Sequence, residues 1–172
     1  LRINYTNATT RAEPYVLYSK VEIGAAKPEV EPTNSMATAN SDPSLYFSGF
    51  VGDAGDVDFF AISANAGDVI FAALDAVPNR ADAGTTATNL NFSLTLVDAD
   101  GGTLLAVDDG SNNNFNFAAV DAGLDSGTPF GPGEGLVWRA RTAGTYLRRV
   151  AKSTTVQSAY LLSVSIGCAN EA

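Results

Sequence analysis

The sequence contains no histidine and only one cysteine, Cys168. Without histidine the chain cannot build a Ser-His-Asp or Cys-His catalytic centre, a histidine metal site or an imidazole pH switch. A single cysteine excludes an internal disulfide and a zinc site made of several cysteines. These absences remove the commonest catalytic and transition-metal chemistries before any motif is considered.

Positive charge and long apolar runs are also scarce. The 172 residues carry 10 Lys and Arg against 19 Asp and Glu, which gives a formal net charge of -9 at pH 7. Such a surface repels phosphate backbones and anionic lipid, so we do not expect nucleic-acid binding. No apolar stretch approaches the ~20 residues that a membrane-spanning helix needs, so we expect no membrane insertion. An acidic, lysine-poor chain with Asp-rich turns suits a secreted, extracellular or cell-surface protein.

What the sequence does contain is a series of short strands with alternating apolar and polar residues. They are separated by turns rich in Gly, Asn and Asp, and no long helical periodicity is present. The predicted strands are Tyr15–Ile23, Leu45–Val51, Asp58–Ser63, Asp68–Asp75, Asn91–Val97, Thr103–Val107, Asn114–Phe117, Leu136–Ala140, Gly144–Val150 and Ala159–Ile166. Many short strands with polar turns predict an all-β fold, an antiparallel β-sandwich of jelly-roll type with an additional N-terminal hairpin.

No catalytic motif accompanies these strands. Paired carboxylates could hydrolyse a glycoside, but no motif here places an acid opposite a base. The sequence has no Gly-x-Ser-x-Gly elbow, and its glycine-bearing turns lack the Gly-Lys-Ser/Thr of a phosphate-binding loop. We therefore expect that the protein is not an enzyme and has no catalytic residues.

The chain begins with a stretch that looks like the end of a domain. "LRINYTNATTRAEPYVLYSKVEIG" (1–24) and "LRRVAKSTTVQSAYLLSVSIG" (147–167) both start with Leu-Arg, pass a Thr-rich segment, reach a Tyr-led strand and close on Ile-Gly. We expect both to be hairpins and interpret the similarity as an internal repeat. The alternative is that any two hairpins of this composition look alike. The predicted division is a hairpin at 1–25, a sandwich at 26–167 and a tail at 168–172.

A lone two-stranded hairpin is barely stable in water. Residues 1–24 must therefore pack on the main sandwich or complete an open sheet edge of a neighbouring molecule. We accordingly expect the partners to be copies of this chain or neighbouring repeats. Head-to-tail contacts of this kind form filaments when they do not close.

Five motifs in order resemble the bacterial pre-peptidase C-terminal domain. They are "EVEPTNSMATA", "FSGFVGDAGDVDFFAISANAGDVI", "NLNFSLTLVDADGGTLLAVDDG", "RTAGTYLRRV" and "AYLLSVSIG", and they cover about Glu29 to Gly167. The resemblance implies a secreted, non-catalytic β-sandwich that serves as an accessory module of extracellular enzymes or as a tandem unit of surface proteins. The related collagen-binding modules of collagenases bind calcium near the start of the domain.

The same resemblance implies a Ca²⁺ site. Matched residue by residue, it assigns the ligands to Glu29, Glu31, Asn34, Asp56 and Asp58, which together supply several of the oxygen atoms that calcium requires. The sequence departs from the family pattern at Thr33, often Asn, and at Phe59, often Tyr. The alternative for this acidic group is a set of solvated turns and a cap on the short segment "NSMATA".

Two functions are compatible with these observations. The first is a non-catalytic extracellular structural or adhesive module, a repeat of a surface protein or a self-associating and filament-forming subunit. The second is a substrate-targeting accessory module of a secreted hydrolase, which binds collagen-like protein or polysaccharide.

Overall fold

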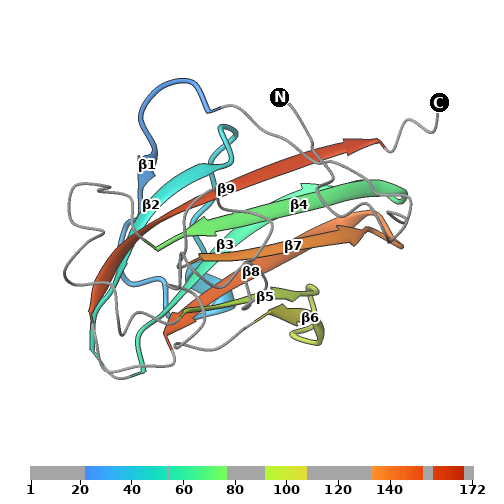
Figure 1. Ribbon diagram of the computed structural model, residues 1–172. Helices are drawn as coiled ribbons and strands as arrows, with labels where there is room; N and C mark the ends of the chain where they lie inside the picture. The colour runs from blue at the N-terminus through green and yellow to red at the C-terminus, as the bar shows by residue number, and fades with distance from the viewer. Residues whose placement is uncertain (1–21, 54, 77–91, 108–132, 153–156, 169–172) are drawn as a thin grey trace, which may run out of the picture.

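A computed structural model shows an all-β sandwich of two sheets (Figure 1). It describes residues 22–53, 55–76, 92–107, 133–152 and 157–168. The strands are β1 (Lys27–Pro28), β2 (Tyr46–Val51), β3 (Val57–Ala64), β4 (Asp68–Asp75), β5 (Phe92–Val97), β6 (Thr103–Val107), β7 (Gly133–Arg139), β8 (Gly144–Lys152) and β9 (Ser158–Cys168). A 3₁₀ turn occupies Met36–Thr38, within the segment "NSMATA".

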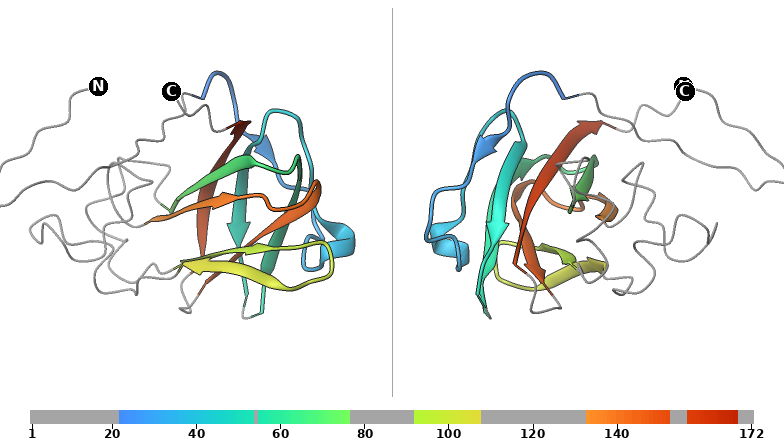
Figure 2. Two further views of the ribbon diagram at one scale, coloured as in Figure 1. Left: turned by 90° about the vertical axis from the view of Figure 1, so that its right-hand side faces the viewer. Right: turned by 60° about the vertical axis from the view of Figure 1, so that its left-hand side comes forward.

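The strand pairing is that of a jelly roll. β2 pairs with β9, β3 with β8, β4 with β7 and β5 with β6, so the pairs are nested as in one long hairpin that has been rolled up. Rolling gives the sheet orders β1-β2-β9-β4-β7 and β3-β8-β5-β6. The views in Figure 2 show these two layers facing each other. The predicted antiparallel jelly-roll sandwich is therefore confirmed.

The core forms because alternate residues of each strand point between the sheets. In β4, for example, Ile70, Ala72 and Leu74 are completely buried, while the residues between them are half-buried on the outer face. β9 contributes Tyr160, Leu162 and Val164 in the same way. These are the positions that the period-two pattern of the sequence assigns to one face.

One predicted pairing is wrong. The hairpin of β5 and β6 is present, with Leu96 opposite Leu105. The stretch 147–167, however, is not a hairpin, because β8 pairs with β3 and β5 whereas β9 pairs with β2 and β4. In the jelly roll these consecutive strands cross from one sheet to the other. The stretch 147–167, to which residues 1–24 are similar in sequence, therefore consists of two strands that belong to different sheets.

Several predictions concern residues outside the described ranges. These are the N-terminal hairpin up to residue 21, the strand Asn114–Phe117 and the tail beyond Cys168. Within the described ranges no helix is long and apolar enough to span a membrane.

Among the described residues, the core contains a buried cation, Arg148 of β8. Its side chain is completely buried, and its Nη2 donates a hydrogen bond to the Phe60 carbonyl at 3.1 Å. The guanidinium lies 5.9 Å from the ring centroid of Phe47, and Nε and Nη1 have no hydrogen-bond partner. Burial lowers the pKa of Arg148 to about 9. Such a group destabilises the fold, because desolvation is only partly compensated.

We expect Arg148→Met to stabilise the protein. Replacing a poorly compensated buried ion with an apolar side chain of similar volume often adds about 1–4 kcal/mol, and the lost bond to Phe60 subtracts about 1 kcal/mol. Thermal unfolding should show a higher Tm by several degrees. Arg149→Met, on the half-buried outer face, is the control and should change little. A lower Tm for Arg148→Met would show that the buried cation is a net stabilising group.

Candidate functional site

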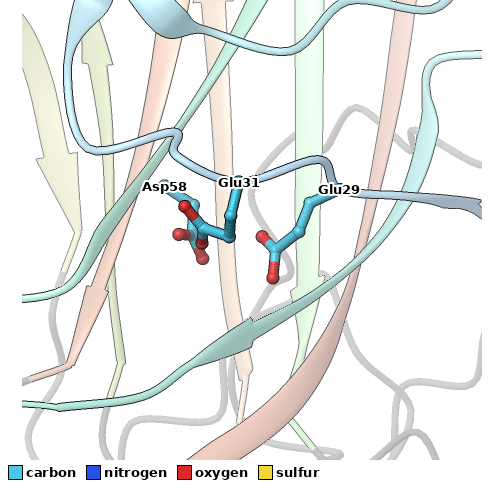
Figure 3. Close-up of side chains that lie close together, drawn as sticks. All are labelled: Glu29, Glu31 and Asp58. Atoms are coloured by element: carbon cyan, nitrogen blue, oxygen red, sulfur yellow. The ribbon is translucent and has the colours of Figure 1, made fainter.

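Three carboxylates converge at one end of the sandwich. Glu29 and Glu31 come from the segment that follows β1, and Asp58 is the second residue of β3. One carboxylate oxygen from each residue lies within 4.8 Å of the other two. Figure 3 shows the three side chains pointing toward one another across the gap between the segment and β3.

The backbone around β1 fixes the position of Glu29. β1 lies parallel to β2, and the Glu29 N–H extends this pairing by donating to the Ser48 carbonyl at 2.9 Å. The Glu29 carboxylate then accepts a hydrogen bond from the Phe50 N–H at 2.6 Å. Glu29 therefore caps the outer edge of β2 with both its backbone and its side chain.

Asp58 is held from two directions. Its side chain is completely buried, and it accepts hydrogen bonds from the Tyr160 hydroxyl at 2.6 Å and from the Thr33 hydroxyl at 3.0 Å. The Tyr160 hydroxyl also lies 3.3 Å from Glu29 Oε2. Thr33 donates its N–H to Glu31 Oε2 at 2.7 Å. Two buried hydroxyl groups thus connect all three carboxylates.

A glycine makes room for this arrangement. A Cβ at Gly49 of β2 would lie 2.2 Å from the Tyr160 hydroxyl oxygen and 2.7 Å from Glu29 Oε2. Real Cβ atoms do not approach other atoms so closely, so only glycine allows Tyr160 to reach the carboxylates at this point.

The three negative charges are poorly compensated. Burial, followed by repulsion from Asp58, raises the pKa of Glu29 to about 7. Burial also raises the pKa of Asp58 to about 6, although hydrogen bonds from Tyr160 and Thr33 act in the opposite direction. No ion pair among the described residues neutralises either group. A cation placed between the three carboxylates would supply the missing charge.

Asn34 and Asp56 lie near the three carboxylates but outside the cluster itself. Both line an open hollow beside it, together with Glu29, Glu31, Phe50, Gly52, Asp53 and Gly55. Asp56 Oδ2 accepts a hydrogen bond from the Gly52 N–H at 2.5 Å, and Asn34 Oδ1 accepts one from the Val57 N–H at 3.2 Å. The structure therefore brings three of the five predicted ligands together, while the other two each use a side-chain oxygen to accept a backbone N–H.

Sequence reasoning missed two residues of the site. The sequence motifs single out Thr33 only as a departure from the family pattern. They contain Tyr160 only as the tyrosine that leads the last strand. Their positions give a signal in retrospect. Thr33 lies between two acidic residues and β3, and Tyr160 shares its strand face with Leu162, so a polar hydroxyl at that buried position requires a partner.

The acidic turn between β5 and β6, at Asp98 and Asp100, is explained by backbone hydrogen bonds. Asp98 Oδ1 accepts hydrogen bonds from the N–H groups of Asp100 and Gly102, at 3.1 and 2.7 Å. This is the turn chemistry of an Asx residue. Asp108 and Asp109 lie outside the described residues.

The sequence matches no family model and no curated protein. Several solved structures are similar to the structure of this protein. The pre-peptidase C-terminal domain of a Bacillus anthracis collagenase is 14% identical over 70% of this chain and 87% of its own, with a TM-score of 0.43. A mitogen derived from Yersinia pseudotuberculosis is 14% identical over 74% and 86%, with a TM-score of 0.39. CorA, a surface-associated copper-binding protein of Methylomicrobium album BG8, is 10% identical over 75% and 98%, with a TM-score of 0.43.

The first of these structures comes from the family that the sequence motifs resemble. At these identities and TM-scores the likeness establishes nothing about function.

Proposed function

We propose that the protein is a calcium-binding, non-catalytic module of an extracellular structural or adhesive protein. The observation that carries this proposal is the convergence of Glu29, Glu31 and Asp58 without a compensating cation among the described residues. The raised pKa values of Glu29 and Asp58 show that their ionised forms are unfavourable in this position. A bound divalent cation would stabilise the ionised carboxylates.

The donor atoms favour a hard cation. The cluster offers only oxygen, whereas copper and zinc sites are built mainly from histidine and cysteine. Calcium takes six to eight oxygen ligands in flexible geometry. Glu29, Glu31 and Asp58 would supply carboxylate oxygens, and the open hollow beside them leaves space for water to complete the shell. The ion would tie the segment after β1 to β3.

The extracellular setting is supported by composition rather than by the site. The chain is strongly acidic and has little lysine. Extracellular fluid holds enough calcium to occupy a site of modest affinity. In the absence of a catalytic arrangement among the described residues, a structural role in contact with copies of the same chain or with extracellular protein or polysaccharide fits best. The N-terminal residues 1–24 would mediate the self-association.

Isothermal titration of the chelator-treated chain with Ca²⁺ tests the metal site. We expect saturable binding and a Tm that rises with Ca²⁺ concentration, because a ligand that binds only the folded state stabilises it. Asp58→Asn should weaken binding at least tenfold. Asp100→Asn, in an exposed turn, is the matched control and should bind like the wild type. Absence of heat and of any Tm increase in the wild type would refute the calcium site.

A further inference from the structure

Among the described residues, the sheet of β3, β8, β5 and β6 has an unprotected edge strand, β6. Among the described residues β6 pairs with β5 alone, and its sequence Thr-Leu-Leu-Ala-Val contains neither a charged residue nor proline. Thr103 and Ala106 are exposed. Leu105 and Val107 pack against the core but remain partly exposed. Exposed edge strands pair readily with other chains unless charge, proline or a covering segment prevents it.

Among the described residues, the other edges of the sandwich are covered or carry charge. Along β3, the Phe59 N–H donates to the Thr33 carbonyl, and Asn40 exchanges hydrogen bonds with Phe59 and Ala61. β2 is covered by β1 and by the carboxylate of Glu29. The remaining edge strand, β7, carries the exposed charged residue Arg139. Within the described part of the chain, only β6 thus presents an edge that has neither cover nor charge.

We propose that β6 accepts the N-terminal strand of a second copy of this chain, residues 15–21, by strand addition. This inference rests on the proposed self-association and names the surface that would receive residues 1–24. Residues 1–21 lie outside the described ranges, and their sequence predicts a strand that cannot be stable alone. Main-chain hydrogen bonds along β6 would supply the affinity, and apolar side chains of the added strand would cover Leu105 and Val107.

The position of Glu22 favours a second copy over the same chain. Glu22 forms a hydrogen bond with Ser163, in the centre of the β1-β2-β9-β4-β7 sheet. β6 belongs to the other sheet, about 10 Å away, and lies on the side opposite β1 (Figure 1). Residues directly before Glu22 therefore cannot lie along β6 of their own copy while this contact is kept. In a second copy, Glu22 is held by its own Ser163 in the same way, but β6 of a neighbouring molecule can be brought to the residues that precede it.

Lysine substitutions on the exposed edge of β6 test the proposal. In the full chain, Thr103→Lys combined with Ala106→Lys should reduce self-association at least tenfold, because lysine on an edge strand opposes pairing. The control combines Ser63→Lys with Ala159→Lys, which adds the same charge at exposed positions of β3 and β9. Analytical ultracentrifugation measures association, and circular dichroism verifies the fold. If both double variants associate like the wild type, the β6 site is wrong while self-association stands. A monomeric wild type would overturn both.

Cross-linking identifies the strand that binds. In a Cys168→Ser background, one copy carries Ala106→Cys and a second carries cysteine at position 16, 18 or 20. We expect at least one mixture to form a disulfide-linked heterodimer on mild oxidation. The double variant with both cysteines in one chain is the control and should form intermolecular rather than internal bonds. An internal bond would overturn docking to a second copy, and no bond in any mixture would overturn β6 as the receiving edge.

Discussion

Gly49→Ala should lower the Tm by about 2–12 °C and weaken Ca²⁺ binding. The added methyl group would overlap the Tyr160 hydroxyl and the Glu29 carboxylate, at 2.2 and 2.7 Å. Overpacking of this kind costs about 1–3 kcal/mol, and each kcal/mol shifts the Tm of a chain of this size by about 2–4 °C. Tyr160 is completely buried, so its ring has little space in which to move away.

Gly144→Ala is the matched control for this substitution. A Cβ at Gly144 meets no atom within 4 Å, so the same chemical change should leave stability and Ca²⁺ binding nearly unchanged. Differential scanning calorimetry measures both variants. Equal melting temperatures for the two would mean that Tyr160 does not occupy the position that links the carboxylates.

The pH dependence of stability should reverse when calcium is added. Without metal, the raised pKa values of Glu29, about 7, and Asp58, about 6, mean that the folded state binds protons more tightly than the unfolded state. Their contribution is then fully present below about pH 4 and is lost as the pH rises through 6 to 7. In a chelator the Tm should fall by a few degrees between pH 5 and pH 8. With Ca²⁺, which requires the ionised carboxylates, it should rise over the same interval.

A double variant isolates the groups responsible. Glu29→Gln combined with Asp58→Asn removes both titrating carboxyls, so its Tm in chelator should vary less between pH 5 and pH 8 than that of the wild type. Melting curves followed by circular dichroism are sufficient. If the slope for the wild type has the same sign with and without Ca²⁺, the ion does not bind to these carboxylates.

The fold was largely predictable because alternation is a local property. Residues such as Leu94 and Leu96, or Ile70 and Leu74, reveal their buried face without any knowledge of their neighbours. Strand partners are not local. The sequence around β8 and β9 gives two good strands joined by a polar segment, which is also the pattern of a hairpin, and only the closure of the whole roll assigns them to different sheets.

The candidate site was predictable in part for the same reason. Glu29 and Glu31 are close in sequence, and the resemblance to a known family linked them to Asp58. Asn34 and Asp56 have the right chemistry, but each uses an oxygen to accept a backbone N–H, from Val57 of β3 and from Gly52. Tyr160 reaches the site from a strand more than 100 residues away in the sequence from Asp58. No sequence pattern indicates that contact, because it depends on β9 lying next to β2 and on the absence of a side chain at Gly49.

Terbium luminescence tests the central claim that a hard cation binds between Glu29, Glu31 and Asp58. Tb³⁺ takes oxygen ligands as Ca²⁺ does, and a tyrosine a few ångströms away can transfer its excitation energy to the ion. Because the Tyr160 hydroxyl contacts two of the three carboxylates, we predict tyrosine-sensitised emission that Ca²⁺ displaces and that Tyr160→Phe abolishes. Emission that persists in Tyr160→Phe, or that Ca²⁺ does not displace, would contradict the assignment of the metal site.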